Sequence, residues 1–166
     1  MFIPFENLSL EAKLWVYQAP RDFTPTELAY MTQILQAFVE KWETHQQPLQ
    51  ASFQLLHNRF IILAVEESYL AASGCSIDTS VAIIRQVSQH LGIDLFDRVM
   101  INYKTIDETW QATPMTAIKA KIAAHEFTND TIIFNTLVQT KKELAENAFI
   151  KASNSWVKRY FITQNS

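Results

Sequence analysis

Glycine is the residue that this sequence lacks most clearly, since Gly74 and Gly92 are the only two among 166 positions. Average usage of about 7% predicts roughly a dozen. The two common phosphate-binding loops need at least two glycines close together in the sequence, and this chain has no such pair. The dinucleotide fingerprint has the pattern G-x-G-x-x-G, and the Walker loop has the pattern G-x-x-x-x-G-K-[ST]. Neither pattern can be formed here, so the sequence excludes nucleotide binding by either loop.

Cysteine and long apolar runs are also scarce. Cys75 is the only cysteine, so the chain can form neither an internal disulfide nor a zinc site built from cysteines alone. The densest apolar run covers residues 60–65, which is far short of the roughly 18 residues that a membrane span needs. Residues 1–7 lack the positive region of a secretory signal and include Pro4 and Glu6. We expect a cytoplasmic protein with no membrane partner.

Charge of one sign is not in large excess, because the net charge is −3. No molecule-wide positive field attracts nucleic acid, and we expect no nucleic-acid partner. Basic side chains gather among aromatic ones near the C-terminus, at Lys141, Lys142, Lys151, Lys158 and Arg159. This pattern is more typical of a solvated face beside packed aromatics than of a surface for an acidic partner.

Motifs for metals and for serine nucleophiles are absent as well. The four histidines, His45, His57, His90 and His125, show no H-x-x-x-H or H-E-x-x-H spacing. No G-x-S-x-G sequence occurs. We expect neither a metal ion nor another cofactor.

The residues that are present predict the order β-α-β-β-α-β over the first 104 positions. Four segments rich in β-branched and aromatic residues predict strands over 13–17, 49–57, 59–65 and 98–103. Apolar residues at spacings of three and four predict helices over 24–42 and 77–91. Thr24, Pro25 and Glu27 form the signature of a helix start. Asn58 is suited to a tight turn, and Gly92 is suited to a helix end.

This order matches the ferredoxin-like fold, in which one antiparallel sheet carries both helices on one face. We therefore expect an α+β protein of that type, with a single domain over residues 1–166. Residues 1–104 would form the core, and 105–166 would form a C-terminal α/β elaboration. In that elaboration we expect a helix from Thr113–Pro114, a strand over 131–134, helix-favouring residues over 141–149, and a terminal strand or docking segment over 153–161.

Polar groups are unusually dense at the expected start of the second helix, over residues 73–80. The candidate binding residues there are Ser73, Gly74, Ser76, Asp78, Thr79 and Ser80, and Cys75 is a candidate nucleophile. One interpretation is structural: Ser76 or Asp78 caps the helix, Gly74 turns the chain with positive φ, and Cys75 is a small buried residue.

Two functional interpretations compete with helix capping. The free N–H groups of the helix start could bind an anion, although the carboxylate of Asp78 would repel it. Alternatively, the helix dipole could activate the Cys75 thiol, which would then need a base or an external thiol. Arg98 is a further candidate binding residue. Together with Asp97, it is more typical of a pair that fixes the entry to a strand.

The chain resembles a family of small uncharacterised bacterial proteins of about this length that share a G-C-S-I-D motif. The matching segments are residues 73–80, Leu95–Arg98, Ile133–Val138, Asn154–Trp156 with Arg159, and Trp15–Gln18. The resemblance implies the label "ABC-transporter ATPase", which such proteins often carry, but the missing glycine loops contradict that activity. The family pattern has a histidine after the C-terminal Ser-Trp, where this chain has Val157. The resemblance therefore does not supply a base for Cys75.

The favoured function is a binding or interaction module for a small molecule or a protein. Its site would lie at residues 73–80, with Asp97, Arg98, Asn135 and the Trp156 segment nearby. One alternative is an enzyme with Cys75 as nucleophile, and another is a subunit of an assembly with an aromatic interface.

Overall fold

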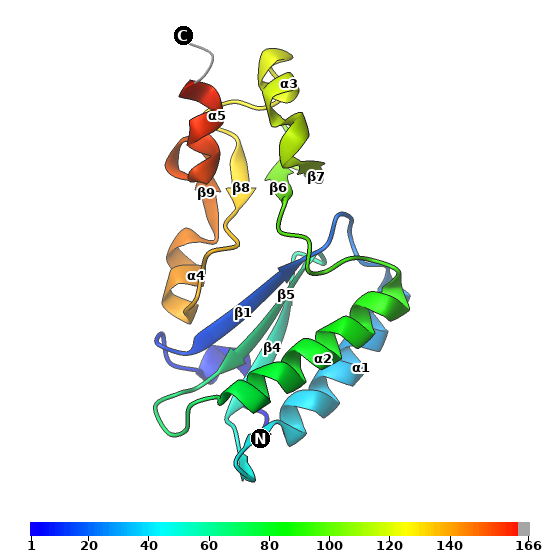
Figure 1. The fold of residues 1–166 in the computed structure, drawn as a ribbon, viewed down its shortest axis with the longest axis vertical. Coiled ribbons are helices and arrows are strands. Elements are labelled where there is room, and N and C mark those ends of the chain that lie inside the picture. The colour runs from blue at the N-terminus through cyan, green and yellow to red at the C-terminus, as the bar shows by residue number, and fades with distance from the viewer. Residues whose placement is uncertain (163–166) are drawn as a thin grey trace.

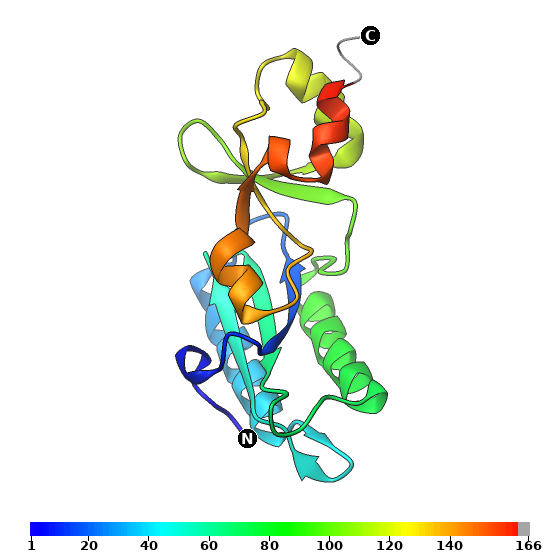
Figure 2. The same ribbon diagram turned by 90° about the vertical axis from the view of Figure 1, so that its left-hand side faces the viewer.

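The computed structural model describes residues 1–162 of the chain as a mixed α+β protein with antiparallel sheets. Its first sheet has the strand order β1-β5-β4. These strands cover Lys13–Gln18, Phe60–Val65 and Ala51–Leu56. Helices α1 (Pro25–Lys41) and α2 (Gly74–Leu91) lie on one face of this sheet (Figures 1 and 2). The predicted order β-α-β-β-α is thus confirmed for β1, α1, β4, β5 and α2, with an unpredicted small hairpin between α1 and β4.

The second sheet has the order β7-β6-β8-β9. Its strands cover Met100–Lys104 (β6), Trp110–Pro114 (β7), Ile132–Phe134 (β8) and Phe149–Lys151 (β9). The remaining helices are α3 (Ile118–Ala123), α4 (Lys141–Asn147) and α5 (Arg159–Ile162). A small hairpin joins β2 (Glu43–Thr44) to β3 (Gln47–Pro48). Single 3-10 turns occur at Phe5–Asn7, Met115–Ala117, Ala152–Asn154 and Trp156–Lys158.

The expectation of one ferredoxin-like sheet is wrong in its last strand. The strand expected at 98–103 forms as β6, and it pairs with β7 and β8 instead of joining the first sheet. The outer edge of β1 is already occupied, because the Leu14 N–H donates to the Gln139 carbonyl at 2.9 Å. Lys13 also forms a β-bridge with Thr140. A segment from late in the chain therefore takes the place that the last ferredoxin strand would fill.

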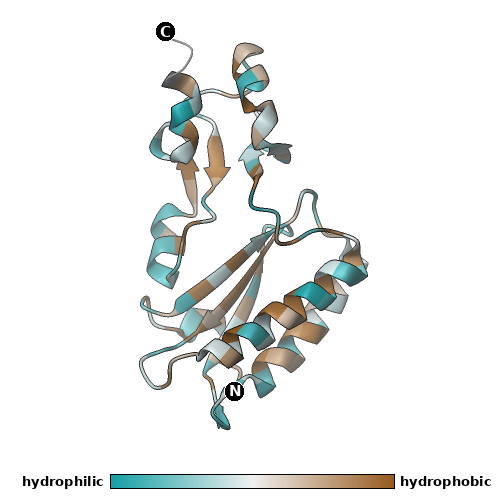
Figure 3. Ribbon diagram, in the orientation of Figure 1, coloured by the Kyte–Doolittle hydropathy of each residue, from teal (hydrophilic) through white to brown (hydrophobic). Residues whose placement is uncertain are grey.

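Both faces of the first sheet are covered, which explains why every residue of β5 is buried. On one face, Ile61 and Leu63 pack with Met31 of α1 and Ile84 of α2. On the other face, the cluster includes Phe60, Ile62 and Ala64 from β5 and Val138, Leu144 and Ala148 from the segment around α4. Strand β5 is therefore apolar along its length, whereas α1 and α2 alternate between polar and apolar residues (Figure 3).

The helix boundaries follow the predicted capping signals closely. Thr24 caps α1, with its hydroxyl accepting from the Glu27 N–H while the Glu27 carboxylate accepts from the Thr24 N–H. Gly92 ends α2 in the left-handed conformation with φ of 65°. Helix α2 begins three residues before the expected start at 77, because Ser73 is its N-cap.

The turns use other residues where glycine would be usual. His45 and Gln46 both have positive φ between β2 and β3, and His57 and Asn58 do so between β4 and β5. Two successive left-handed residues form the turn that matches the twist of a two-stranded hairpin. Because glycine is scarce, residues with side chains adopt the left-handed conformation at these turns, and this strains their backbone.

Several C-terminal elements differ from the sequence expectation. Thr113 and Pro114 end strand β7, and the helix expected from them begins at Ile118 after a 3-10 turn. Strand β8 and helix α4 form within the expected 131–134 and 141–149. Residues 153–161 form no strand and consist of 3-10 turns and the start of α5.

Candidate functional site

The hydroxyl groups at residues 73–80 are mostly used inside α2. The Ser73 hydroxyl accepts from the Ser76 N–H at 3.2 Å, and the Ser76 hydroxyl donates to the Ser73 carbonyl at 2.8 Å. The hydroxyls of Thr79 and Ser80 donate to the carbonyls of Cys75 and Ile77, at 2.9 and 2.6 Å. These bonds cap the helix start and fill its first turns.

Three details of the structural interpretation need correction. The N-cap is Ser73, and neither Ser76 nor Asp78 has that position. Gly74 lies inside the helix without a positive φ, since Gly92 is the only described glycine in the left-handed region. Cys75 is exposed, contrary to the expectation of a small buried residue.

The Cys75 thiol lacks the surroundings of an activated nucleophile. Within residues 1–162 it forms no hydrogen bond, and an activated thiol normally has a base within hydrogen-bond reach. Asp78 is also exposed, and among the described residues its carboxylate forms no ion pair. Catalysis by Cys75 stays a prediction that no contact in the structure supports.

Arg98 lies at the opposite end of α2 from the polar segment. The helix has 18 residues and is therefore about 27 Å long. Arg98 follows its C-terminal end and is close enough to Tyr17 for its charge to act on that phenol. Burial raises the pKa of Tyr17, and the positive charge of Arg98 partly opposes this shift. Arg98 therefore shares no site with residues 73–80.

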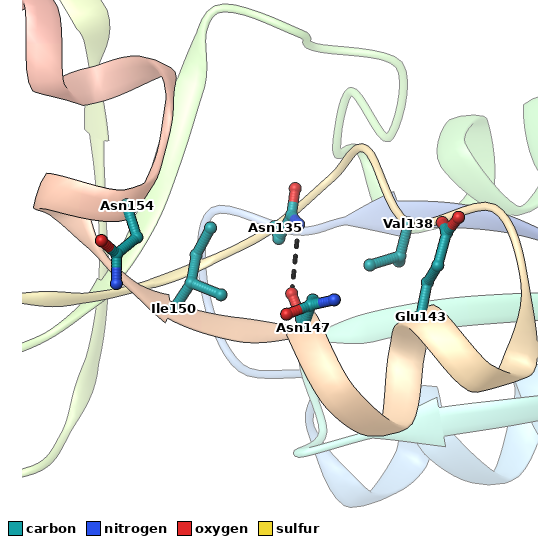
Figure 4. A pocket seen from close by; sticks show the side chains of 6 residues that line it. All are labelled: Asn135, Val138, Glu143, Asn147, Ile150 and Asn154. Carbon is teal, nitrogen blue, oxygen red and sulfur yellow. Dashed lines mark hydrogen bonds between the residues drawn. The ribbon is translucent and has the colours of Figure 1, made fainter.

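The candidate site lies instead beside α4, in a cavity of about 330 Å³ that we call the amide cleft. It is lined by Asn135, Val138, Glu143, Asn147, Ile150 and Asn154 (Figure 4). These residues come from the segment after β8, from α4, from β9 and from the 3-10 turn that follows β9. The cleft thus collects three asparagine amides, one carboxylate and two apolar side chains from segments up to 19 residues apart in the sequence.

One wall of the amide cleft is held rigidly by backbone contacts. The Asn135 side chain donates through Nδ2 to the Asn147 carbonyl at 3.1 Å and accepts through Oδ1 from the Leu137 N–H at 3.1 Å (Figure 4). The Asn135 N–H donates to the Ala148 carbonyl at 2.8 Å. Asn135 therefore joins the end of β8 to the end of α4 at the amide cleft.

The other polar groups of the cleft have hydrogen-bond donors and acceptors that no described residue uses. Glu143 accepts from the Gln139 N–H through Oε2 at 2.7 Å, which leaves Oε1 without a partner among the described residues. The side chains of Asn147 and Asn154 form no hydrogen bond within residues 1–162 and are exposed. Each of these two amides can donate two hydrogen bonds and accept two.

No protein-family model, curated protein or solved structure matches this chain. The resemblance to the G-C-S-I-D family accordingly stays a prediction. Two of the segments that carry it, Ile133–Val138 and Asn154–Trp156, meet at the amide cleft through Asn135 and Asn154. Asn135 therefore lines the amide cleft and does not lie near residues 73–80, where we expected it.

A second polar feature, for which the sequence shows no local signal, is a network around the buried Arg59 and Asn102 where the two sheets meet. Arg59 donates to Asn102 Oδ1 at 2.7 Å, to Asp22 Oδ1 at 2.8 Å and to the Pro20 carbonyl at 2.9 Å. Asn102 donates to Gln18 Oε1 at 3.1 Å and to the Ala19 carbonyl at 3.0 Å. Because the charge and the amide are nearly fully paired, this network is a structural link and not an open site.

Glu66 is the only buried carboxylate among the described residues. Burial alone would raise the pKa of Glu66, but hydrogen bonds from Ser9 and Ser68 outweigh this and lower it. The Ser9 N–H and hydroxyl donate to Glu66 at 2.7 and 3.0 Å. Glu66 thus anchors the N-terminal segment to the end of β5 as an ion.

Among residues 1–162, no group of three or more histidine, cysteine, aspartate or glutamate side chains is arranged to hold a metal ion. The helices of this part of the chain also include none with the length and hydropathy of a membrane span.

Proposed function

We propose that this protein is a binding module whose ligand is a small, polar, uncharged or positively charged molecule held in the amide cleft. The observation that carries the proposal is a pair of amides, Asn147 and Asn154, that form no hydrogen bond with the described residues and line one cavity beside Asn135, whose side chain is bonded to the Asn147 carbonyl. A volume of about 330 Å³ is at the lower end of the range for small-molecule sites.

The chemistry of the lining selects against anions. Among the described residues that line the cleft, Glu143 is the only ionisable one, and its carboxylate repels negative charge and attracts positive charge. Val138 and Ile150 add an apolar contact surface, which suits a ligand with a short carbon skeleton. An amide, a guanidinium group or an alkylammonium group fits this combination of donors, acceptors and charge.

The proposal moves the site away from residues 73–80, because the hydroxyls there are bonded within α2. It retains the expectation of a cytoplasmic protein without a nucleic-acid partner. The single cysteine and the net charge of −3 support that part of the proposal.

The direct test is a titration of the ¹⁵N-labelled protein with three probes: acetamide, methylguanidinium and inorganic phosphate. We expect acetamide and methylguanidinium to shift the side-chain NH₂ resonances of Asn147 and Asn154, at millimolar concentration for fragments of this size. Phosphate should leave these resonances unchanged. Shifts with phosphate alone, or shifts centred on residues 73–80, would show that the site is wrong.

Matched variants separate binding from folding. Asn154→Ala removes one free amide from the cleft, and Asn129→Ala removes an exposed asparagine that lies outside it. We expect the first variant to lose most of the probe-induced shifts at Asn147 and the second to keep them. Both variants should unfold at nearly the wild-type temperature, because neither side chain has a partner in the described residues.

A further inference from the structure

Strand β7 lies at one edge of the second sheet (Figure 1), and one side of its backbone pairs with no strand of residues 1–162. Hydrogen bonds to the β6 side are made at both ends of the pairing, by the Thr109 carbonyl and the Met115 N–H, each at 2.8 Å. In an antiparallel ladder only alternate residues bond to a given neighbour, so the odd-numbered residues of β7 face β6. The N–H and C=O groups of Trp110 and Ala112 therefore point away from the sheet.

Other segments of the described chain cover the outer edges of β4 and β1 at one end of each strand. On β4, Ala51 is bonded to the N-terminal segment through the Met1 carbonyl and the Ile3 N–H, at 3.0 and 2.8 Å. On β1, the Leu14 N–H is bonded to the Gln139 carbonyl. Strand β9 is only three residues long and ends with Lys151. Short strands, charged residues and covering segments are the usual means of preventing edge-to-edge pairing.

Strand β7 has little of this protection. Its five residues, Trp110–Pro114, include no charged side chain, although 19% of the whole chain is charged. Pro114 lies at an outward-facing position but has no N–H, so it cannot donate a hydrogen bond to an added strand at this end of β7. The free edge is thereby limited to residues 110–112, and this limit restricts the register in which another strand can pair.

We propose that a second copy of this chain binds at this edge, with the two β7 strands antiparallel about a two-fold axis at Gln111. In this register Trp110 lies opposite the partner subunit's Ala112, and Ala112 lies opposite the partner subunit's Trp110. Each of these pairs exchanges two backbone hydrogen bonds. The two second sheets then form one continuous sheet.

The side chains favour a copy of the same strand over a charged partner. A large indole lies opposite a small methyl group in both pairs, so the two Trp110 rings do not compete for space. Lys104 already lies over the Trp110 ring, with Nζ 5.6 Å from its centroid. The uncharged edge neither repels its own copy nor attracts a charged peptide.

Charge placed on the two-fold axis tests this register. Gln111 is exposed, and its Oε1 accepts one long hydrogen bond, from the Tyr103 hydroxyl at 3.4 Å. Gln111→Lys and Gln111→Glu therefore cost one chain little beyond this bond but bring two like charges face to face in the dimer. We expect wild-type protein to dimerise with rising concentration in sedimentation velocity, and each variant alone to dimerise about fivefold more weakly. An equal mixture of the two variants should recover the wild-type level or exceed it. Gln89→Lys, on the exposed face of α2, serves as the control and should behave as wild type.

Hydrogen exchange at single amides gives a second readout that does not depend on variants. In dilute protein, the Trp110 and Ala112 N–H groups should exchange much faster than those of Gln111 and Thr113. In concentrated protein, only the Trp110 and Ala112 N–H groups should become protected from exchange. A monomer at all concentrations, a dimer that the Gln111 charges do not affect, or protection that appears at β9 instead of β7 would overturn the proposal.

Discussion

Removal of the Asn102 side chain is the sharpest test of how the two sheets are held together. Asn102 is fully buried, with 0% of its surface exposed. In Asn102→Ala, three buried groups lose a partner: the Arg59 Nε–H, the Gln18 Oε1 and the Ala19 carbonyl. A buried polar group without a partner costs about 1–3 kcal/mol. Water that enters the space left by the side chain recovers part of this cost, so we expect a loss of about 3 kcal/mol in the free energy of unfolding.

Urea unfolding followed by tryptophan fluorescence measures this loss, with equal m-values as the sign that one transition is being compared. Asn129→Ala, at an exposed asparagine, is the control and should change the free energy by less than about 0.5 kcal/mol. The loss of free energy of unfolding for Asn102→Asp should lie between the losses for Asn102→Ala and Asn129→Ala. It keeps an acceptor for Arg59 but loses the donors to Gln18 and Ala19. A loss below about 1 kcal/mol for Asn102→Ala would refute the view that this hydrogen-bond network holds the two sheets together.

Three further predictions concern other parts of the fold. Glu66→Gln should lower the free energy of unfolding at pH 7 by about 1–2 kcal/mol. Because the folded pKa of Glu66 is lowered, the difference from wild type should be complete above the ordinary glutamate pKa and should shrink as the pH falls below it, which urea unfolding at several pH values measures. Thr24→Ala should cost about 1 kcal/mol by removing the cap of α1, or about 2–4 °C in thermal unfolding, and an unchanged melting temperature would contradict the capping role. Gln46→Gly should stabilise the protein by up to about 1 kcal/mol in the same assay, because Gln46 has φ of 65°; a destabilised variant would show that its side chain has a role that the turn does not explain.

Local signals predicted the N-terminal elements well. The Thr24 capping box, the turn at Asn58 and the helix end at Gly92 each depend on a few neighbouring residues, and each forms where it was expected. The error in the sheet arose because pairing is not local. The segment 98–103 predicts a strand in either sheet, and its place is decided by the contact of Leu14 with Gln139, far away in the sequence.

The candidate site shows the same division between local and distant information. The density of polar residues at 73–80 was visible in the sequence, but such residues are also what a helix start needs, and their hydroxyls are used there. The amide cleft had no local signal, because Glu143, Asn147 and Asn154 are ordinary surface residues until α4 and β9 bring them beside Asn135. Four short strands were missed for a similar reason, since β2, β3, β7 and β9 have two to five residues and need their neighbours to form.

The most direct test of the central claim is the titration of wild-type protein and Asn154→Ala with methylguanidinium, followed at the side-chain NH₂ resonances of Asn147. We predict that these resonances shift with saturation in wild-type protein, that the shift is largely lost in Asn154→Ala, and that phosphate produces none. An equal, saturable shift in both proteins, or no shift in either, would contradict the assignment of the amide cleft as the binding site.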